Sequence, residues 1–408
     1  MDVGTTAAGT LRRDMRVIGL VSGAHFLSHF YQLVLPPLYL ALRAEFDVSF
    51  AALGALTGTL FVASGVSQPV AGFLVDRYGA RSVLLAGLAL FAGATAALGL
   101  VPSFWLMFPL AAIAGLGNAV FHPADFPILN ASVDPRRLGR AYSVHGIAGN
   151  LGWIAAVPSS LFLGEVFGWR VALIVLGCLG LAATVYLASQ RDAMVDHRHA
   201  KSERAPPTSL AEDVRMLMAP HILLSFSFFA LMSMALIGVQ TFVPQALTQF
   251  HSMPIELAGG ALTAFLIGGV LGTLAGGVVA DRFRHPETII CAAMTAFAAI
   301  FFVLVIPGLA HVLILSIFVI TGMLMGLAGP PRDMLVRDRT PAGAAGKVYG
   351  FIYAGLDAGA AVMPPVFGWL LDRGEPRFIF VLMSLVIALS VLTVLQLRRP
   401  AAVAATTP

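Results

Sequence analysis

Charged residues are scarce in this chain. Only 11% of its 408 residues are Asp, Glu, Lys or Arg, whereas soluble globular domains carry about 25%. This scarcity argues against a soluble enzyme and against a disordered chain. The net charge of +4 is too small for the basic face of a nucleic-acid-binding protein. Cysteine is also scarce: Cys178 and Cys291 both lie in apolar runs, so no disulfide framework is expected.

Long apolar runs take the place of charge. Hydrophobic residues make up 58% of the chain, and a helix needs about 20 mostly apolar residues to cross a bilayer. Twelve such runs are present, at residues 17–42, 51–74, 82–100, 104–129, 141–163, 169–189, 220–248, 255–279, 287–306, 311–335, 346–370 and 377–396. The predicted fold class is therefore an all-α membrane protein with twelve transmembrane helices in the lipid bilayer.

The distribution of Lys and Arg predicts the orientation. If the N-terminus is cytoplasmic, 21 of the 25 basic residues fall on the cytoplasmic side and four fall on the other side. Because basic residues are retained in cytoplasmic loops, we expect a multi-pass protein of the cell (inner) membrane with both termini in the cytoplasm.

A polar stretch divides the runs into six and six. We predict an N-terminal half at residues 1–189, a cytoplasmic linker at 190–219 and a C-terminal half at 220–408. The halves also resemble each other, because an offset of 207 residues superposes Gly115, Pro123, Gly152 and Pro158 on Gly322, Pro330, Gly359 and Pro365. Two pseudo-symmetric six-helix halves are typical of secondary transporters, which bind solute near the middle of the membrane.

A motif follows the second run. It reads Gly72-Phe-Leu-Val-Asp76-Arg77-Tyr-Gly79-Ala-Arg81, and a second copy keeps Gly277, Asp281 and Arg282 but loses the later glycine. The motif resembles the G-x-L-x-D-R-x-G-x-R signature of the major facilitator superfamily. This resemblance implies the major facilitator fold and a cytoplasmic latch between the halves. Asp76 would then lie near Lys347 and Asp281 near Arg140, as gate residues and not as substrate ligands.

Two further stretches are similar to the fosmidomycin-resistance branch of that superfamily. They are residues 24–31, AHFLSHFY, and residues 117–124, GNAVFHPA, followed by His145 in the next run. The resemblance implies proton-coupled export of an anionic phosphonate. Drug–proton antiporters often carry G-P-x-x-G-G in the fifth span, but residues 155–160 keep only Pro158 of that element. Uptake and export therefore both remain as hypotheses for the direction of transport.

Ionisable and amide side chains inside the runs are candidates for function, because such groups are costly in a membrane. His25, His29 and Gln32 share one helical face by their spacing, as His122 and Asp125 share another. The candidates for the substrate or proton pathway are His25, His29, Gln32, His122, Asp125, His145, Gln240, Arg332 and Asp357.

Each candidate has an alternative. His25 and His29 could carry protons, since histidine titrates near neutral pH, or could join helices by hydrogen bonds. Their i, i+4 spacing would suit Zn²⁺, but the sequence indicates no third ligand, so no metal is expected. Asp125 would act in coupling or gating, or would pair with Arg136, Arg137 or Arg140.

The second half offers an arginine and a carboxylate. Arg332 would hold an anion, or would be paired with Asp333. Asp357 would be a protonatable coupling site, or the counter-ion of Arg332.

The leading hypothesis is a secondary transporter of a small, anionic organic solute that works by alternating access. The repeat, the motif at Asp76 and the His, Asp and Arg residues inside the spans suggest coupling to protons. The sequence has no Walker-type loop, so ATP is not expected to drive transport directly. We expect export slightly more than uptake of an organic anion such as a carboxylate or phosphonate. We also expect the protein to be a monomer, to need no cofactor and to bind no nucleic acid. The remote alternatives are a membrane-integral metalloenzyme using His25, His29 and His122, and a sensor.

Overall fold

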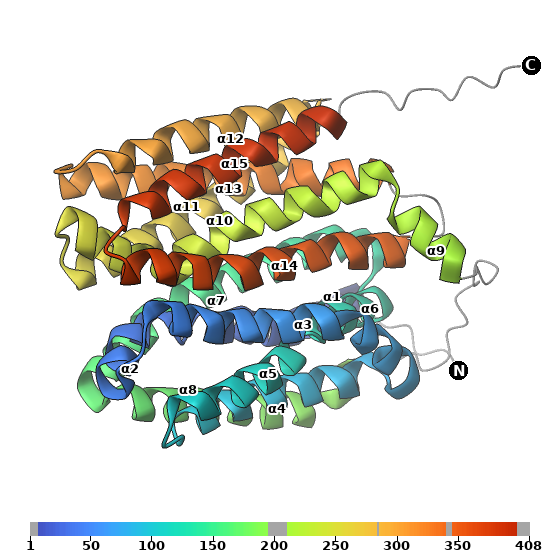
Figure 1. Ribbon diagram of the computed structural model, residues 1–408. Helices are drawn as coiled ribbons and strands as arrows, with labels where there is room; N and C mark the ends of the chain where they lie inside the picture. Colours follow the sequence, from blue (N-terminus) through green and yellow to red (C-terminus); the bar gives the residue numbers. More distant parts are fainter. Residues whose placement is uncertain (1–6, 195–209, 284, 340–344, 398–408) are drawn as a thin grey trace, which may run out of the picture. The chain divides into compact units, whose positions relative to one another are not determined.

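The computed structural model describes residues 7–194, 210–283, 285–339 and 345–397. Within these ranges the chain forms α-helices and short 3-10 helices and contains no strand. The chain divides into two compact units, Met1–Ser202 and Glu203–Pro408 (Figure 1). The all-α prediction is therefore confirmed for the described residues.

Eight α-helices make up the described part of the first unit. They are α1 (Ala7–Gln32), α2 (Tyr39–Phe46), α3 (Phe50–Tyr78), α4 (Ala80–Leu98), α5 (Met107–Asn118), α6 (Phe121–Ser132), α7 (Leu138–Phe167) and α8 (Trp169–Ser189). The fourth predicted run is thus two helices, with a break at Ala119 and Val120. Pro123 favours the break, because it lacks an N–H and its ring clashes with the carbonyl of Ala119 four residues earlier. It is not sufficient alone, since the equivalent Pro330 lies inside a continuous helix of the second unit.

Seven α-helices make up the described part of the second unit. They are α9 (Leu210–Leu217), α10 (Pro220–His251), α11 (Ile255–Arg282), α12 (Pro286–Phe302), α13 (His311–Arg339), α14 (Ala345–Asp372) and α15 (Arg377–Leu397). The described end of the predicted linker is therefore helical, at α9, while residues 195–209 of it lie outside the described residues. The tenth span stays one helix, α13, although it contains Pro330 and Pro331.

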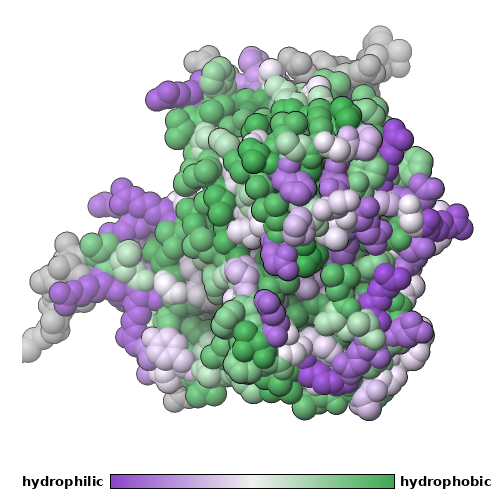
Figure 2. All heavy atoms as spheres, turned by 90° about the vertical axis from the view of Figure 1, so that its left-hand side faces the viewer, coloured by the Kyte–Doolittle hydropathy of each residue, from purple (hydrophilic) through white to green (hydrophobic). Residues whose placement is uncertain are grey.

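Among the described residues, twelve helical segments are long and apolar enough to cross a membrane, which confirms the predicted number of spans. Two are ten residues longer than predicted: the first extends over Leu11–Phe46 and the fifth over Pro135–Phe167. Large apolar side chains such as Phe73, Trp105 and Val312 are exposed. Apolar residues, green in Figure 2, occupy much of the surface in that view. Such a surface suits a lipid environment.

Several helix pairs recur in the two units, in agreement with the internal repeat, although α10 also packs on α15 in the second unit. In the first unit α7 packs on α1, α5 on α3 and α4, and α8 on α4. In the second unit α14 packs on α10, α13 on α11 and α12, and α15 on α12.

Glycines allow the helix backbones to touch at equivalent places. A Cβ atom on Gly115 would lie 2.2 Å from the carbonyl oxygen of Leu60, and one on Gly322 would lie 2.0 Å from that of Phe265. The two glycines are 207 residues apart and their two partners 205 apart. The repeat seen in the sequence is therefore also a repeat of close contacts.

Backbone geometry requires a glycine at one position of the motif after the second span. Gly79 has φ of 90°, donates its N–H to the carbonyl of Val75 at the end of α3, and precedes the first residue of α4. A side chain would be strained in that conformation. At the corresponding turn of the second unit, Phe283 is extended and α12 begins only at Pro286, so the turn is longer and needs no such glycine there.

The predicted latch itself stays a prediction. The side chains of Asp76, Asp281 and Lys347 lie outside the described residues, while Arg140 is exposed. Arg77 and Arg282 are exposed in the last turns of α3 and α11, where positive charge complements the helix dipole.

The contact between α1 and α7 generates a testable prediction. A Cβ on Gly152 would lie 2.2 Å from the carbonyl oxygen of Phe26, whereas one on Gly146 of the same helix would meet nothing within 4 Å. We expect Gly152→Ala to destabilise the purified protein by about 1–3 kcal/mol, because the helices must separate. Gly146→Ala should leave the melting temperature in detergent unchanged or raise it, since Ala favours helix. Equal melting temperatures for the two variants would contradict the close contact.

Candidate functional site

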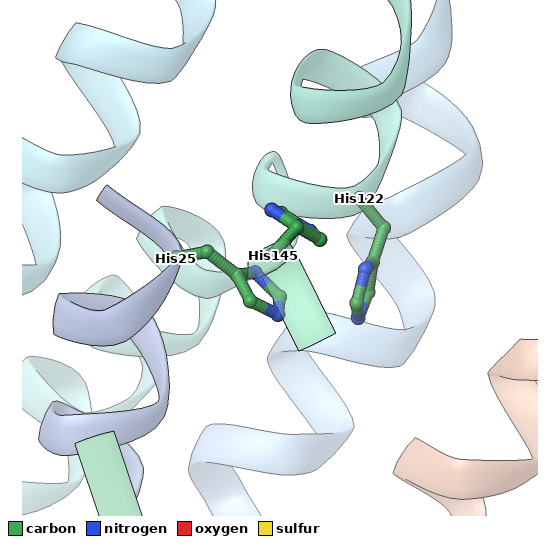
Figure 3. A group of neighbouring side chains, drawn as sticks. All are labelled: His25, His122 and His145. Carbon is green, nitrogen blue, oxygen red and sulfur yellow. The ribbon is translucent and has the colours of Figure 1, made fainter. Parts of the chain in front are cut away.

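Three helices of the first unit bring ionisable side chains together. Helix α1 carries His25 and His29, α6 carries His122 and Asp125 in its first five residues, and α7 carries His145. His25 and His145 are each 3% exposed and Asp125 is 0% exposed, while His122 is half-buried. Figure 3 shows the rings of His25, His122 and His145 gathered between their helices.

Asp125 lies at the centre of this group. Its Oδ2 is 3.2 Å from Nδ1 of His25 and 3.6 Å from Nε2 of His145. The rings of His25 and His145 are stacked with centroids 3.7 Å apart, and the centroids of His25 and His122 are 5.4 Å apart.

These close approaches are not hydrogen bonds. Among the described residues, neither oxygen of Asp125, neither ring nitrogen of His145, nor Nδ1 of His25 has a hydrogen-bonding partner. Burying polar atoms without partners costs free energy. Polar atoms that lack partners inside a membrane span are suited to bind a ligand that can form hydrogen bonds or coordinate bonds with them.

Gly149 makes room for the rings. A Cβ atom at this position of α7 would lie 2.8 Å from Nδ1 of His29 and 3.0 Å from Cδ2 of His25. The glycine therefore lets two histidines of α1 lie against the backbone of α7.

A chain of hydrogen bonds runs beside the histidines and joins four helices. Trp153 donates from Nε1 to Oε1 of Gln32 at 3.2 Å, and Gln32 donates from Nε2 to Oδ1 of Asn118 at 2.9 Å. Asn118 then donates from Nδ2 to Oγ of Ser64 at 2.9 Å. The indole of Trp153 also contacts the ring of His29, with centroids 4.2 Å apart.

The sequence analysis missed three of the residues that form these hydrogen bonds. Trp153, Asn118 and Ser64 lie in apolar runs, like Gln32, which was recognised. Asn118 could have been found by the same signal, an amide inside a span.

The structure bears on one of the two alternatives for Asp125, its pairing with arginine. Among the described residues, the basic side chains that approach its carboxylate are His25 and His145, not an arginine. Its role in coupling or gating stays a prediction. Arg137 instead pairs with Asp14 at 2.6 Å and with Asp134 at 3.4 Å, while Arg136 and Arg140 are exposed.

The second unit carries the remaining candidates, Gln240, Arg332 and Asp357. Arg332 donates from Nε to Oδ1 of Asp333 at 2.9 Å, so the predicted alternative pairing is present. Its guanidinium also lies over the ring of Phe229, 4.6 Å from the centroid. The side chain of Arg332 is 19% exposed and that of Asp333 is 46% exposed. Gln240 is buried on α10.

Asp357 lies between two glycines of α14 that contact α10. Cβ atoms on Gly355 and Gly359 would lie 2.6 Å from the carbonyl of Phe226 and 2.1 Å from that of Ala230. A residue two positions away on a helix points about 200° round from them. The half-buried Asp357 is thus on the face of α14 turned away from α10.

Comparison with protein families gives two overlapping matches. The sequence model described as "Major Facilitator Superfamily" matches residues 21–259 and 227–408, which together cover almost the whole chain.

Individual relatives are more distant. The chain is 28% identical over 282 residues to "Fosmidomycin resistance protein" of Escherichia coli, covering 68% of each chain. It is 22% identical over 378 residues to "Probable nitrate/nitrite transporter NarK2" of Mycobacterium tuberculosis, covering 89% of this chain and 92% of the relative.

A solved structure shares the fold. The crystal structure of a bacterial homologue of the human lysosomal transporter Spinster has a TM-score of 0.72 at 15% identity, covering 94% of this chain and 97% of that one.

The hydrogen-bonded chain around Gln32 generates a prediction for stability. Gln32→Leu removes its bonds to Trp153 and Asn118, and interhelical bonds in membranes contribute ~0.6 kcal/mol each on average. We expect a loss of about 1 kcal/mol, measured as a lower melting temperature in detergent. Gln396→Leu, at an exposed position of α15, is the matched control and should have no such effect. An unchanged melting temperature for Gln32→Leu would show that these hydrogen bonds do not stabilise the first unit.

Proposed function

Since the chain belongs to the Major Facilitator Superfamily, we propose that it is a proton-coupled secondary transporter of a small, anionic organic solute. The family consists of transporters, so the chain is a multi-pass membrane transporter and not an enzyme. The metalloenzyme alternative of the sequence analysis is set aside on that ground.

The observation that carries the anionic substrate is Arg332. Its guanidinium is held mostly buried inside the α13 span, where an unneeded charge would be costly. The hydrogen bond to Asp333 uses Nε, and a guanidinium has four more N–H donors in a fork that matches a carboxylate or phosphonate. Two relatives are named for fosmidomycin resistance and for nitrate/nitrite transport, and nitrate and nitrite are anions.

Asp357 is the carboxylate that we assign to proton coupling. It lies within the α14 span and is half-buried. Whether its carboxyl group is charged therefore depends on its contact with water and on neighbouring charges, which alternating access would change. The sequence has no Walker-type phosphate-binding loop, which favours an ion gradient as the source of energy.

We propose that the polar groups of the first unit around Gln32 contact the solute. Alternating access would expose them to each side of the membrane in turn, with the motif at Asp76 as the cytoplasmic latch. On the distribution of Lys and Arg we further propose a cell-membrane location with both termini in the cytoplasm. We also propose that the transporter is a monomer.

Transport should depend on Arg332 through substrate affinity. Charge-assisted hydrogen bonds contribute about 1.5–3 kcal/mol, so Arg332→Gln should raise the KM for an anionic solute roughly 10- to 100-fold. The measurement is uptake into proteoliposomes across a panel of labelled carboxylates and phosphonates under a pH gradient. Arg373→Gln is the matched control, because that guanidinium also lies over an aromatic ring, Trp369, but is exposed. If wild-type protein moves no anion of the panel, the proposed substrate class is wrong.

Coupling should depend on Asp357. We expect Asp357→Asn to lose accumulation driven by the pH gradient while keeping exchange of labelled for unlabelled solute, because exchange needs no net proton movement. Asp372→Asn, at an exposed position of the same helix, should accumulate solute like the wild type. Full accumulation by Asp357→Asn would remove Asp357 from the coupling mechanism.

The direction of transport separates export from uptake, and we favour export. Expression in a fosmidomycin-sensitive host should raise tolerance to the drug if the chain exports it. New growth on an organic anion as carbon source, without a change in tolerance, would favour the uptake alternative.

A further inference from the structure

We propose that His25, His122, His145 and Asp125 form a binding site for a divalent transition metal of the Zn²⁺ type inside the first unit. This site goes beyond the proposed transport function and its test requires no knowledge of the transported solute.

The spacing of the side chains fits such an ion. One possible ligand atom on each of the three histidines lies within 4.8 Å of the other two. Ligands bonded to a tetrahedral Zn²⁺ at its usual bond lengths lie about 3.3–3.6 Å from one another. The two approaches to Oδ2 of Asp125, 3.2 Å from His25 and 3.6 Å from His145, are already close to this spacing.

His122 is the most accessible of the three histidines. It is half-buried in the first turn of α6, where its ring is stacked with that of the exposed Phe126, whereas His25 and His145 are buried. An ion would therefore reach the group from the side of His122.

The unsatisfied atoms are the second reason for the site. Both oxygens of the fully buried Asp125 and both ring nitrogens of His145 have no hydrogen-bonding partner among the described residues. A buried carboxylate is stable when it is paired or when it coordinates a metal. Arg137, which the sequence analysis offered as a partner for Asp125, is paired with Asp14 and Asp134 instead.

The chemistry of the ligands selects the metal. Three imidazoles and one carboxylate suit Zn²⁺ and its neighbours in the transition series, whereas Ca²⁺ and Mg²⁺ prefer oxygen ligands throughout. The ligands come from α1, α6 and α7, so a bound ion would tie these three helices together. The group of three histidines includes neither His29 nor Asp125. We add Asp125 as the fourth ligand because its Oδ2 approaches both His25 and His145, whereas His29, which the sequence analysis placed beside His25 as the possible pair of ligands, is left out.

The test is metal binding by the full chain, purified in detergent without a polyhistidine tag. Co²⁺ serves as the spectroscopic probe, because tetrahedral Co²⁺ absorbs strongly in the visible range. We expect one equivalent of tetrahedral Co²⁺, displaced by Zn²⁺, and a higher melting temperature of the wild type in the presence of Zn²⁺.

Variants locate the site. His145→Gln and His122→Gln should each weaken binding at least 10- to 100-fold, since even the loss of a residue that only supports a ligand costs that much. His251→Gln is the matched control, because His251 is a buried histidine of α10 that contacts the carbonyl of Leu304. It should bind Co²⁺ like the wild type.

Two results would overturn the proposal. The first is wild-type protein that gives no tetrahedral Co²⁺ spectrum and no Zn²⁺-dependent rise in melting temperature. The second is binding that His251→Gln weakens as much as His122→Gln does. Should His145→Gln fail to fold, the partly exposed His122 still permits a test, and size-exclusion profiles without metal verify that each variant is folded.

Discussion

Backbone contact between helices is the constraint on which each unit depends. Lipid is as apolar as the side chains that it surrounds, so burying apolar surface gives helices little reason to associate in a membrane. Close packing at small residues takes over that role. Gly115 against Leu60 and Gly322 against Phe265 leave no space for a Cβ atom. The same helix pairs therefore form in both units, although most of the residues around these contacts differ.

The candidate site follows from this constraint. Helix α7 approaches α1 closely at Gly149 and Gly152, and the approach brings His145 against His25. The break before α6 then places Asp125 beside both rings. His122 and Asp125 would share one face in a continuous helix as well. The break before α6 sets the direction in which that face is turned. Packing that serves stability thus also collects the ionisable groups.

The two units share a scaffold but not its chemistry. An offset of 207 residues places Arg332 at the position of Asp125, Met232 at that of His25 and Ile352 at that of His145. The first unit accordingly holds a buried carboxylate among imidazoles, and the second holds a guanidinium with its neighbouring acid. Glycine positions are kept because helices must still touch, whereas polar positions are free to diverge and to take different roles.

The sequence by itself determined the twelve spans, the repeat and the set of polar candidates, because hydropathy, spacing and charge are local properties. It placed His25 and His29 on one helical face but could not show that His122 and His145 meet His25, nor that Arg137 pairs with Asp14 and leaves Asp125 to histidine. Likewise it did not connect Trp153 to Gln32. Helical periodicity tells which residues share a face, but the partner of that face and its register depend on how two whole helix surfaces pack, and only the tertiary structure decided that.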